Sequence, residues 1–123
     1  MKIFTNKDSI HVDKEVGISV DYYLRDEYEV HYNKQISGAV QDWHHHEKIS
    51  ETIYIINGEL LAEWKDNDKL NSVIVKTGDL IETEKSPHTF TNNSGKDVEF
   101  LVIKHLLSGK NKREILKNDK VLD

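Results

Sequence analysis

The chain has 123 residues, enough for a buried core, and we expect a single domain over residues 1–123. A net charge of −5 argues against non-specific binding to nucleic acids, and the absence of cysteine excludes disulfide bonds and thiolate metal ligands. No apolar stretch approaches the roughly 20 residues of a membrane span, and the N-terminus lacks the apolar segment of a signal peptide, so we expect a cytoplasmic protein without a membrane partner.

Nearly all predicted elements are short β-strands. Residues 16–24 and 28–36 alternate apolar and polar side chains with a period of two, as half-buried strands do. Further strands are predicted at residues 52–56, 59–64, 70–76, 80–83, 88–91 and 98–107. Asn57-Gly58 is the strongest short hairpin signal in the chain, so we expect the two strands that flank it to pair. Residues 112–118 have a helical pattern.

Many short strands separated by turn residues predict an all-β sandwich or barrel. We expect N-terminal strands within residues 1–29, a barrel over about residues 30–107, and a C-terminal tail over residues 108–123 that contains the short helix. A jelly roll of two sheets protects strand edges and leaves a mouth in which a small site can form.

A histidine-rich segment follows the second predicted strand. In an extended segment, residues two apart share a face, so His44 and His46 point the same way and His45 points opposite. Imidazole is the commonest protein ligand for metals. Glu51, which opens the next strand, can add a carboxylate, and His88 can add a third nitrogen from a distant segment. The sequence therefore predicts a metal site made of His44, His46, Glu51 and His88.

Other candidate ligands fit less well. Glu47 is the competing carboxylate, but it directly follows His46, where the strand face disfavours it. We expect His45 to lie behind the site or to face solvent, and His105 to be a core histidine rather than a pocket residue. No separate catalytic base is identifiable from the sequence.

A nitrogen and oxygen site without thiolate suits one divalent transition metal, namely Fe, Mn, Ni, Zn or Cu. Four protein ligands on an octahedral ion leave two positions open. Such positions admit a substrate, water or dioxygen, which a closed structural site does not.

Strand parity also predicts the walls of the pocket. The face of Glu51 continues through Ile53 and Ile55, which should line the interior below the metal, and Phe90 shares the parity of His88 and should form an apolar wall. Tyr54, on the opposite face, should pack between the sheets.

The strand at residues 28–36 can turn either face inward. We favour the apolar set inward, and the alternative is the polar set. The two sets are Tyr28, Val30 and Tyr32, and Glu29, His31 and Asn33. Gln41 and Trp43 precede the histidines and should flank the mouth.

Two motifs resemble those of the cupins. Gly38-x5-His44-x-His46-x4-Glu51-x6-Gly58 resembles the first cupin motif, G-x5-H-x-H-x3–4-E-x6-G, at every position. Residues 78–92 resemble the second motif, G-x5-P-x-G-x2-H-x3-N, although His88 comes one residue early, Pro87 directly precedes it and the internal glycine is absent.

The cupin resemblance covers about residues 30–107 and implies a double-stranded β-helix barrel, or jelly roll. It implies a metal held by His44, His46, Glu51 and His88. It also implies a homodimer in which the N-terminal segment, near residues 2–4, adds to the partner's sheet.

We expect a metal-dependent enzyme of oxygenase, dioxygenase or isomerase type that acts on a small chelating molecule. The alternative is a non-catalytic module that binds a ligand or a metal. A third option, a metal-independent sugar epimerase, would need a His–carboxylate base and a tyrosine acid. Arginine, which is suited to clamping phosphate, occurs at residues 25 and 113 only, which disfavours substrates with several negative charges.

Overall fold

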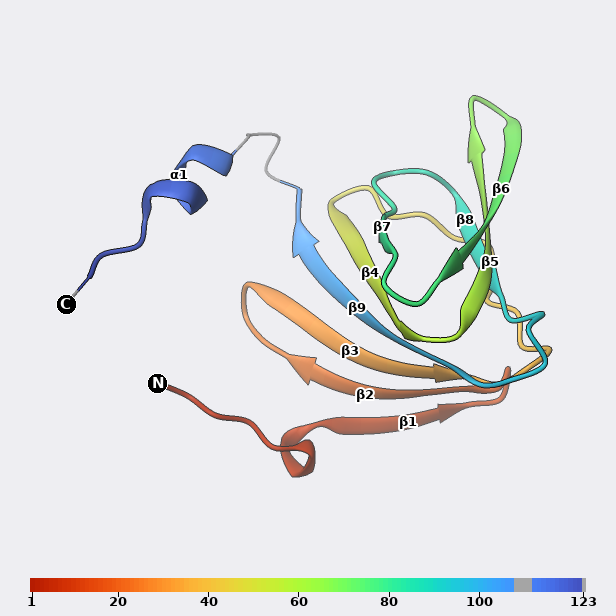
Figure 1. The fold of residues 1–123 in the computed structure, drawn as a ribbon, viewed down its shortest axis with the longest axis horizontal. Coiled ribbons are helices and arrows are strands. Elements are labelled where there is room, and N and C mark those ends of the chain that lie inside the picture. Colours follow the sequence, from red (N-terminus) through yellow and green to blue (C-terminus); the bar gives the residue numbers. More distant parts are fainter. Residues whose placement is uncertain (108–111, 123) are drawn as a thin grey trace.

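The computed structural model describes residues 1–107 and 112–122 of the chain. Figure 1 shows two antiparallel sheets that face each other as the walls of an open barrel. The elements are η1 Asn6–Asp8, β1 Ile10–Lys14, β2 Ile18–Leu24, β3 Tyr28–Gln35, β4 Ile49–Asn57, β5 Glu59–Asp66, β6 Lys69–Lys76, β7 Leu80–Glu82, β8 His88–Thr91, β9 Val98–Leu106 and α1 Arg113–Asn118. The predicted all-β jelly roll with a short C-terminal helix is confirmed.

The two sheets differ in size. The larger has the strand order β1-β2-β3-β9-β4-β7, and the smaller has the order β6-β5-β8. Alternate side chains of both sheets meet in one apolar core, which comprises Ile53, Ile55, Leu60, Ala62, Val75, Phe90, Val98, Phe100 and Val102. Across the described ranges, no helix has the length and apolar character needed to cross a membrane.

The predicted hairpin at Asn57-Gly58 is wrong. Here β4, which pairs with β7 and β9, leaves the larger sheet, and β5 enters the smaller one. Gly58 has a φ of +107°, and a Cβ atom there would lie 3.0 Å from the Val98 side chain, so the crossing requires glycine. A two-residue hairpin instead joins β5 to β6 through Asn67 and Asp68, whose φ values of 50° and 65° match the left-handed turn that hairpins prefer.

The favoured inward face of β3 is also wrong, and the alternative holds. His31 and Asn33 are 5% and 6% exposed, whereas Tyr28 is 49% exposed. The buried residues of β3 lie opposite core residues of β9, in the pairs His31–Val102, Asn33–Phe100 and Gln35–Val98. Burial of these polar groups is tolerated where partners exist: the Gln35 amide donates to the carbonyls of Ala39 at 2.8 Å and Phe90 at 3.2 Å.

Tyr32, which faces away from that wall, gives a test of this register. Burial, a hydrogen bond with Glu99 and the charge of Glu99 raise the pKa of Tyr32 to about 12. The unfolded chain loses this proton near pH 10, so the contribution of Tyr32 to stability is present below about pH 10 and is lost as the pH rises toward 12. The free energy of unfolding of the wild type should therefore fall as the pH rises over this range. Phenylalanine has no hydroxyl to ionise, so we expect the free energy of unfolding of Tyr32→Phe, measured by urea denaturation, to fall less. A wild-type ultraviolet titration in which every tyrosine ionises at its ordinary pKa would contradict the register.

Two further expectations concern residues at the surface of the protein. Tyr54 is 42% exposed on the outer face of β4, so its predicted packing between the sheets is wrong. N-terminal strands were expected within residues 1–29, but the bounds of β1 were not predicted, and all of its side chains are exposed. Residues 2–4 lie outside any strand, and β1 forms an edge of the larger sheet. The homodimer stays a prediction.

Candidate metal centre

Three of the four predicted ligands form one cluster. His44 and His46 lie on the loop between β3 and β4, and Glu51 lies on β4 with 7% exposure. Their ligand atoms all lie within 4.8 Å of one another. Nε2 of His44 is 3.4 Å from Glu51 Oε1, and Nε2 of His46 contacts the same oxygen. This cluster could hold a metal ion.

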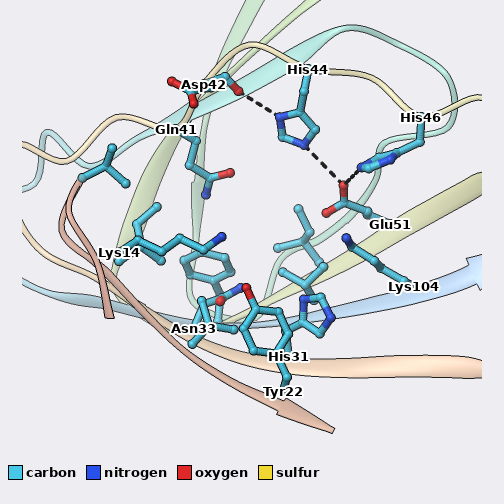
Figure 2. A pocket seen from close by; sticks show the side chains of 16 residues that line it. Lys14, Tyr22, His31, Asn33, Gln41, Asp42, His44, His46, Glu51 and Lys104 are labelled. Carbon is cyan, nitrogen blue, oxygen red and sulfur yellow. Dashed lines mark hydrogen bonds and ion pairs between the residues drawn. The ribbon is translucent and has the colours of Figure 1, made fainter. Parts of the chain in front are cut away.

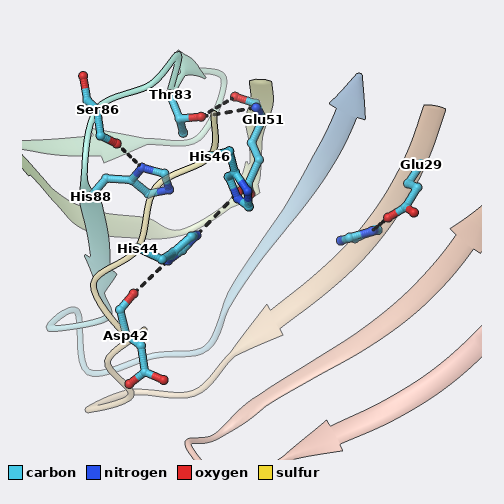
Figure 3. A network of polar contacts seen from close by, with 9 residues as sticks. Glu29, Asp42, His44, His46, Glu51, Thr83, Ser86 and His88 are labelled. Atoms are coloured by element: carbon cyan, nitrogen blue, oxygen red, sulfur yellow. Dashed lines mark hydrogen bonds and ion pairs between the residues drawn. The ribbon is translucent and has the colours of Figure 1, made fainter. Parts of the chain in front are cut away.

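His88 lies beside the cluster but is not one of the three residues within 4.8 Å. As the first residue of β8, it pairs with His44 through two backbone hydrogen bonds of 2.9 and 3.1 Å. Its ring centroid is 4.5 Å from that of His44 and 6.4 Å from that of His46. Figure 3 shows the His88 ring between Ser86 and the other two imidazoles.

Hydrogen bonds fix the tautomers of two of these imidazoles. Nδ1 of His44 donates to the carbonyl of Asp42 at 2.8 Å, and Nδ1 of His88 donates to the carbonyl of Ser86 at 2.7 Å. Each carbonyl lies two residues before its histidine. Each Nδ1 therefore carries a proton, and Nε2 is the ring nitrogen that faces the cluster; in His44 it lies 3.4 Å from Glu51 Oε1.

Nε2 of His88 is the clearest indication of a metal. It is buried and has no hydrogen-bond partner in the parts of the chain that the structure describes. Burial lowers the pKa of His88, which keeps its imidazole neutral and its Nε2 lone pair available. A buried polar atom without a partner costs about 1–3 kcal/mol, so an ion shared with the cluster would fit this nitrogen.

Glu51 supplies the negative charge of the cluster. Burial acts to raise its pKa, but the hydrogen bond from His44 and the positive charges of Lys104 and His46 outweigh it and lower the pKa to about 2. The backbone is held by Thr83, whose Oγ1 accepts from the Glu51 amide at 3.2 Å and whose amide donates to the Glu51 carbonyl at 3.0 Å. Glu51 is thus a fixed, ionised carboxylate at neutral pH.

The residues judged poor ligands lie away from the cluster. The side chains of His45 and Glu47 are 52% and 81% exposed and contact each other at 3.6 Å. Solvent exposure of His45 agrees with one of the two positions expected for it. His105 is exposed near the end of β9, where its Nε2 is 3.4 Å from Thr52 Oγ1, so the expectation of a core histidine is wrong.

A cavity of about 380 Å³ opens beside the cluster, between the histidine loop and the larger sheet (Figure 2). Ile53 lines it as predicted, and Ile55 lies buried in the adjoining core. Gln41 also lines it, whereas the predicted mouth residue Trp43 is 46% exposed and does not. Phe90, 2% exposed, packs against His88 with ring centroids 5.5 Å apart, but both residues line a neighbouring hollow rather than this cavity.

Sequence reasoning missed several polar residues that line this cavity. Lys14, Tyr22 and Lys104 come from β1, β2 and β9, far from the motifs in sequence. Lys104 lies directly opposite Glu51 in the register of β4 and β9. Only the pairing of these strands, which the sequence did not predict, would have identified it.

Several solved structures share this fold. A predicted oxalate decarboxylase from Thermotoga maritima is 24% identical over 86% of this chain and 100% of its own length, with a TM-score of 0.69. The capsular polysaccharide assembling protein CapF from Staphylococcus aureus is 14% identical over 80% of this chain and 31% of its own, with a TM-score of 0.70. Fe(II)-HppE with the alternative substrate (S)-1-HPP is 14% identical over 84% of this chain and 59% of its own, with a TM-score of 0.66.

These identities establish the fold alone, and no curated protein matches the sequence. A family model described as Cupin domain matches residues 33–104, which is more than half of the chain and includes all four predicted ligands. The chain therefore belongs to the cupin domain family.

Proposed function

We propose that the chain binds one divalent transition metal through His44, His46, Glu51 and His88, and that it acts with this metal on a small molecule as an oxygenase or isomerase. The observation that carries the proposal is the buried Nε2 of His88, which has no hydrogen-bond partner within residues 1–107 and 112–122 and lies beside two imidazoles and an ionised carboxylate. Three imidazole nitrogens and one carboxylate, without thiolate, form a donor set suited to Fe, Mn, Ni, Zn or Cu.

The residues around the proposed metal centre have separate roles. Asp42 and Ser86, through their carbonyls, orient the rings of His44 and His88 so that both present Nε2. Glu51 lowers the net charge of the loaded centre by one. A bound divalent ion would supply Lewis-acid polarisation of a substrate oxygen, or redox chemistry with dioxygen. The buried ring of Phe90 packs against the His88 ring and helps to hold it in place.

The similar solved structures support a metal-dependent activity without specifying it. One of them contains Fe(II) together with an alternative substrate of that protein, and another is described as a predicted oxalate decarboxylase. The cavity of about 380 Å³ beside the cluster lies within the size range of small-molecule sites.

An oxygen-consumption assay tests the enzymatic part of the proposal. We expect protein loaded with Fe(II) to consume dioxygen, or to isomerise a keto compound, with at least one member of a panel of thiols, diketones, catechols, keto sugars and keto acids. His46→Ala should lose this turnover, and His45→Ala, which changes an exposed neighbouring histidine, should keep it. Ligand binding without turnover across the panel would instead favour the non-catalytic binding module.

One observation favours a second candidate, the metal-independent sugar epimerase. Nε2 of His31 lies 2.9 Å from Glu29 Oε1, and the His31 ring lies 4.5 Å from the Tyr22 ring in the same cavity. These are the residue types that such a reaction needs. Epimerisation of a keto sugar that survives His46→Ala would favour this candidate over the metalloenzyme.

A further inference from the structure

The cavity wall opposite the histidine loop carries polar groups that the metal centre does not use. Lys104 is half-buried there, and its neighbours across the strands are Glu51 and Glu29. Within the described ranges, no carboxylate lies at ion-pair distance from its ammonium group. Figure 2 shows the Lys104 side chain reaching toward Glu51 along the cavity wall. Lys104 is thus a partly desolvated cation next to the metal centre.

His31 offers the complementary group. It is 5% exposed and lines the cavity, and its Nε2 donates to Glu29 Oε1 at 2.9 Å. This bond places the ring proton on Nε2, so Nδ1 carries a lone pair. No residue in the described part of the chain donates to Nδ1. Among the described residues, a fully buried side-chain nitrogen without a partner is found only at His88, so Nδ1 of His31 is accessible to small molecules. His31 therefore presents a fixed hydrogen-bond acceptor to a molecule in the cavity.

The charges around the cavity favour an anion once a metal is bound. Lys14 and Lys104 balance Asp42 and Glu51 among the charged lining residues, so a divalent ion would leave a formal excess of two positive charges. The lining contains lysine but no arginine, which suits a carboxylate better than a phosphate clamp. The remaining polar lining is neutral and consists of Tyr22, Asn33 and Gln41, which can bind hydroxyl groups.

We infer that this cavity binds small hydroxylated carboxylates, with Lys104 holding the carboxylate and Nδ1 of His31 accepting a hydrogen bond from a hydroxyl. The inference rests on the proposed function, because it places the ligand beside the metal, and it narrows the substrate class to hydroxy acids and sugar acids. Simple alkanethiols and catechols lack the carboxylate that Lys104 would bind. A substrate of this class would combine a charged group for Lys104, a donor for His31 and oxygen atoms able to chelate the ion.

Calorimetric titration of Mn(II)-loaded protein tests the inference with three probes. D-gluconate carries both groups, D-gluconamide lacks the charge, and hexanoate lacks the hydroxyls. We expect gluconate to bind at least about tenfold more tightly than either analogue, as a charge-assisted or buried hydrogen bond allows. Lys104→Met should reduce the ratio of the affinities for gluconate and gluconamide about tenfold and leave the ratio for gluconate and hexanoate unchanged. His31→Phe should reduce the ratio of the affinities for gluconate and hexanoate and leave the ratio for gluconate and gluconamide unchanged.

Matched surface variants control for general effects. Lys76→Met and His105→Gln change an exposed lysine and an exposed histidine outside this cavity, and both should preserve the wild-type ratios. His31→Gln replaces His31→Phe if the latter does not fold. The inference would be overturned if gluconate bound no more tightly than its analogues. It would also be overturned if the Lys104 and His31 variants left the affinity ratios unchanged. If the protein takes up no metal and yet keeps the Lys104-dependent preference for gluconate, the proposed metal centre is refuted, whereas the carboxylate site at Lys104 stands.

Discussion

Replacing His46 by alanine is expected to abolish metal binding, whereas replacing His45, one residue earlier, is expected to preserve it. Nε2 of His46 contacts the same Glu51 oxygen that His44 faces, while the His45 side chain is 52% exposed and contacts Glu47. Even residues that merely orient a ligand change metal affinity by about 10–100-fold, so loss of a ligand should exceed this. Elemental analysis of protein purified without chelator should give about one transition metal per wild-type and His45→Ala chain.

His88 provides the stricter form of this comparison, because it comes from a different segment of the chain. His88→Ala should also lose the metal, and near-ultraviolet circular dichroism should show that the variant remains folded. Metal content equal to that of the wild type in a folded His88→Ala protein would refute its assignment as a ligand. Loss in the His46 variant together with retention in the His88 variant would reduce the site to the three residues within 4.8 Å.

The second prediction with a large expected effect is that metal binding raises the thermal stability of the protein. An ion that binds the folded chain alone stabilises it by about 4 kcal/mol at a free concentration of about 1,000 times Kd. For a domain of this size, each kcal/mol raises Tm by roughly 2–8 °C, so saturating metal should raise Tm by at least about 8 °C. Scanning calorimetry with added Zn(II) or Mn(II), and then with excess chelator, measures this shift directly.

The ligand variants decide what such a shift means. His46→Ala should show almost no change of Tm with metal, and His45→Ala should respond as the wild type does. An equal rise of Tm in the His46 variant would show that the ion stabilises the chain from another site. The buried Nε2 of His88 gives the physical reason for expecting the rise, since an ion would satisfy a nitrogen that has no partner among the residues that the structure describes.

The sequence allowed the fold class and the cluster to be predicted because both depend on local patterns. Strand periodicity and turn residues are readable within a few positions. The common direction of His44 and His46 was predicted from extended backbone geometry and Glu51 from its place at the start of the next strand, and the structure places the three ligand atoms within 4.8 Å of one another. The contribution of His88 to the ligand set stays a prediction, although its ring packs 4.5 Å from that of His44.

The errors concern features that depend on pairing between distant strands. Asn57-Gly58 has the local signature of a hairpin, yet the chain crosses there between sheets because β4 pairs with β9 and β5 with β8. The two faces of β3 have equal periodicity, and its pairing with β9 turns His31 inward. Lys104 enters the cavity through the same strand. Without knowledge of these partners, periodicity gives the alternation of a strand but not which of its faces is buried.

The most direct test of the metal centre is a crystal structure of metal-soaked protein with anomalous diffraction collected at the absorption edge of that metal. We predict one strong anomalous peak per chain, bonded to Nε2 of His44, His46 and His88 and to a carboxylate oxygen of Glu51. A peak at another location, or a peak at the cluster with the His88 imidazole outside bonding distance of the ion, would contradict this account.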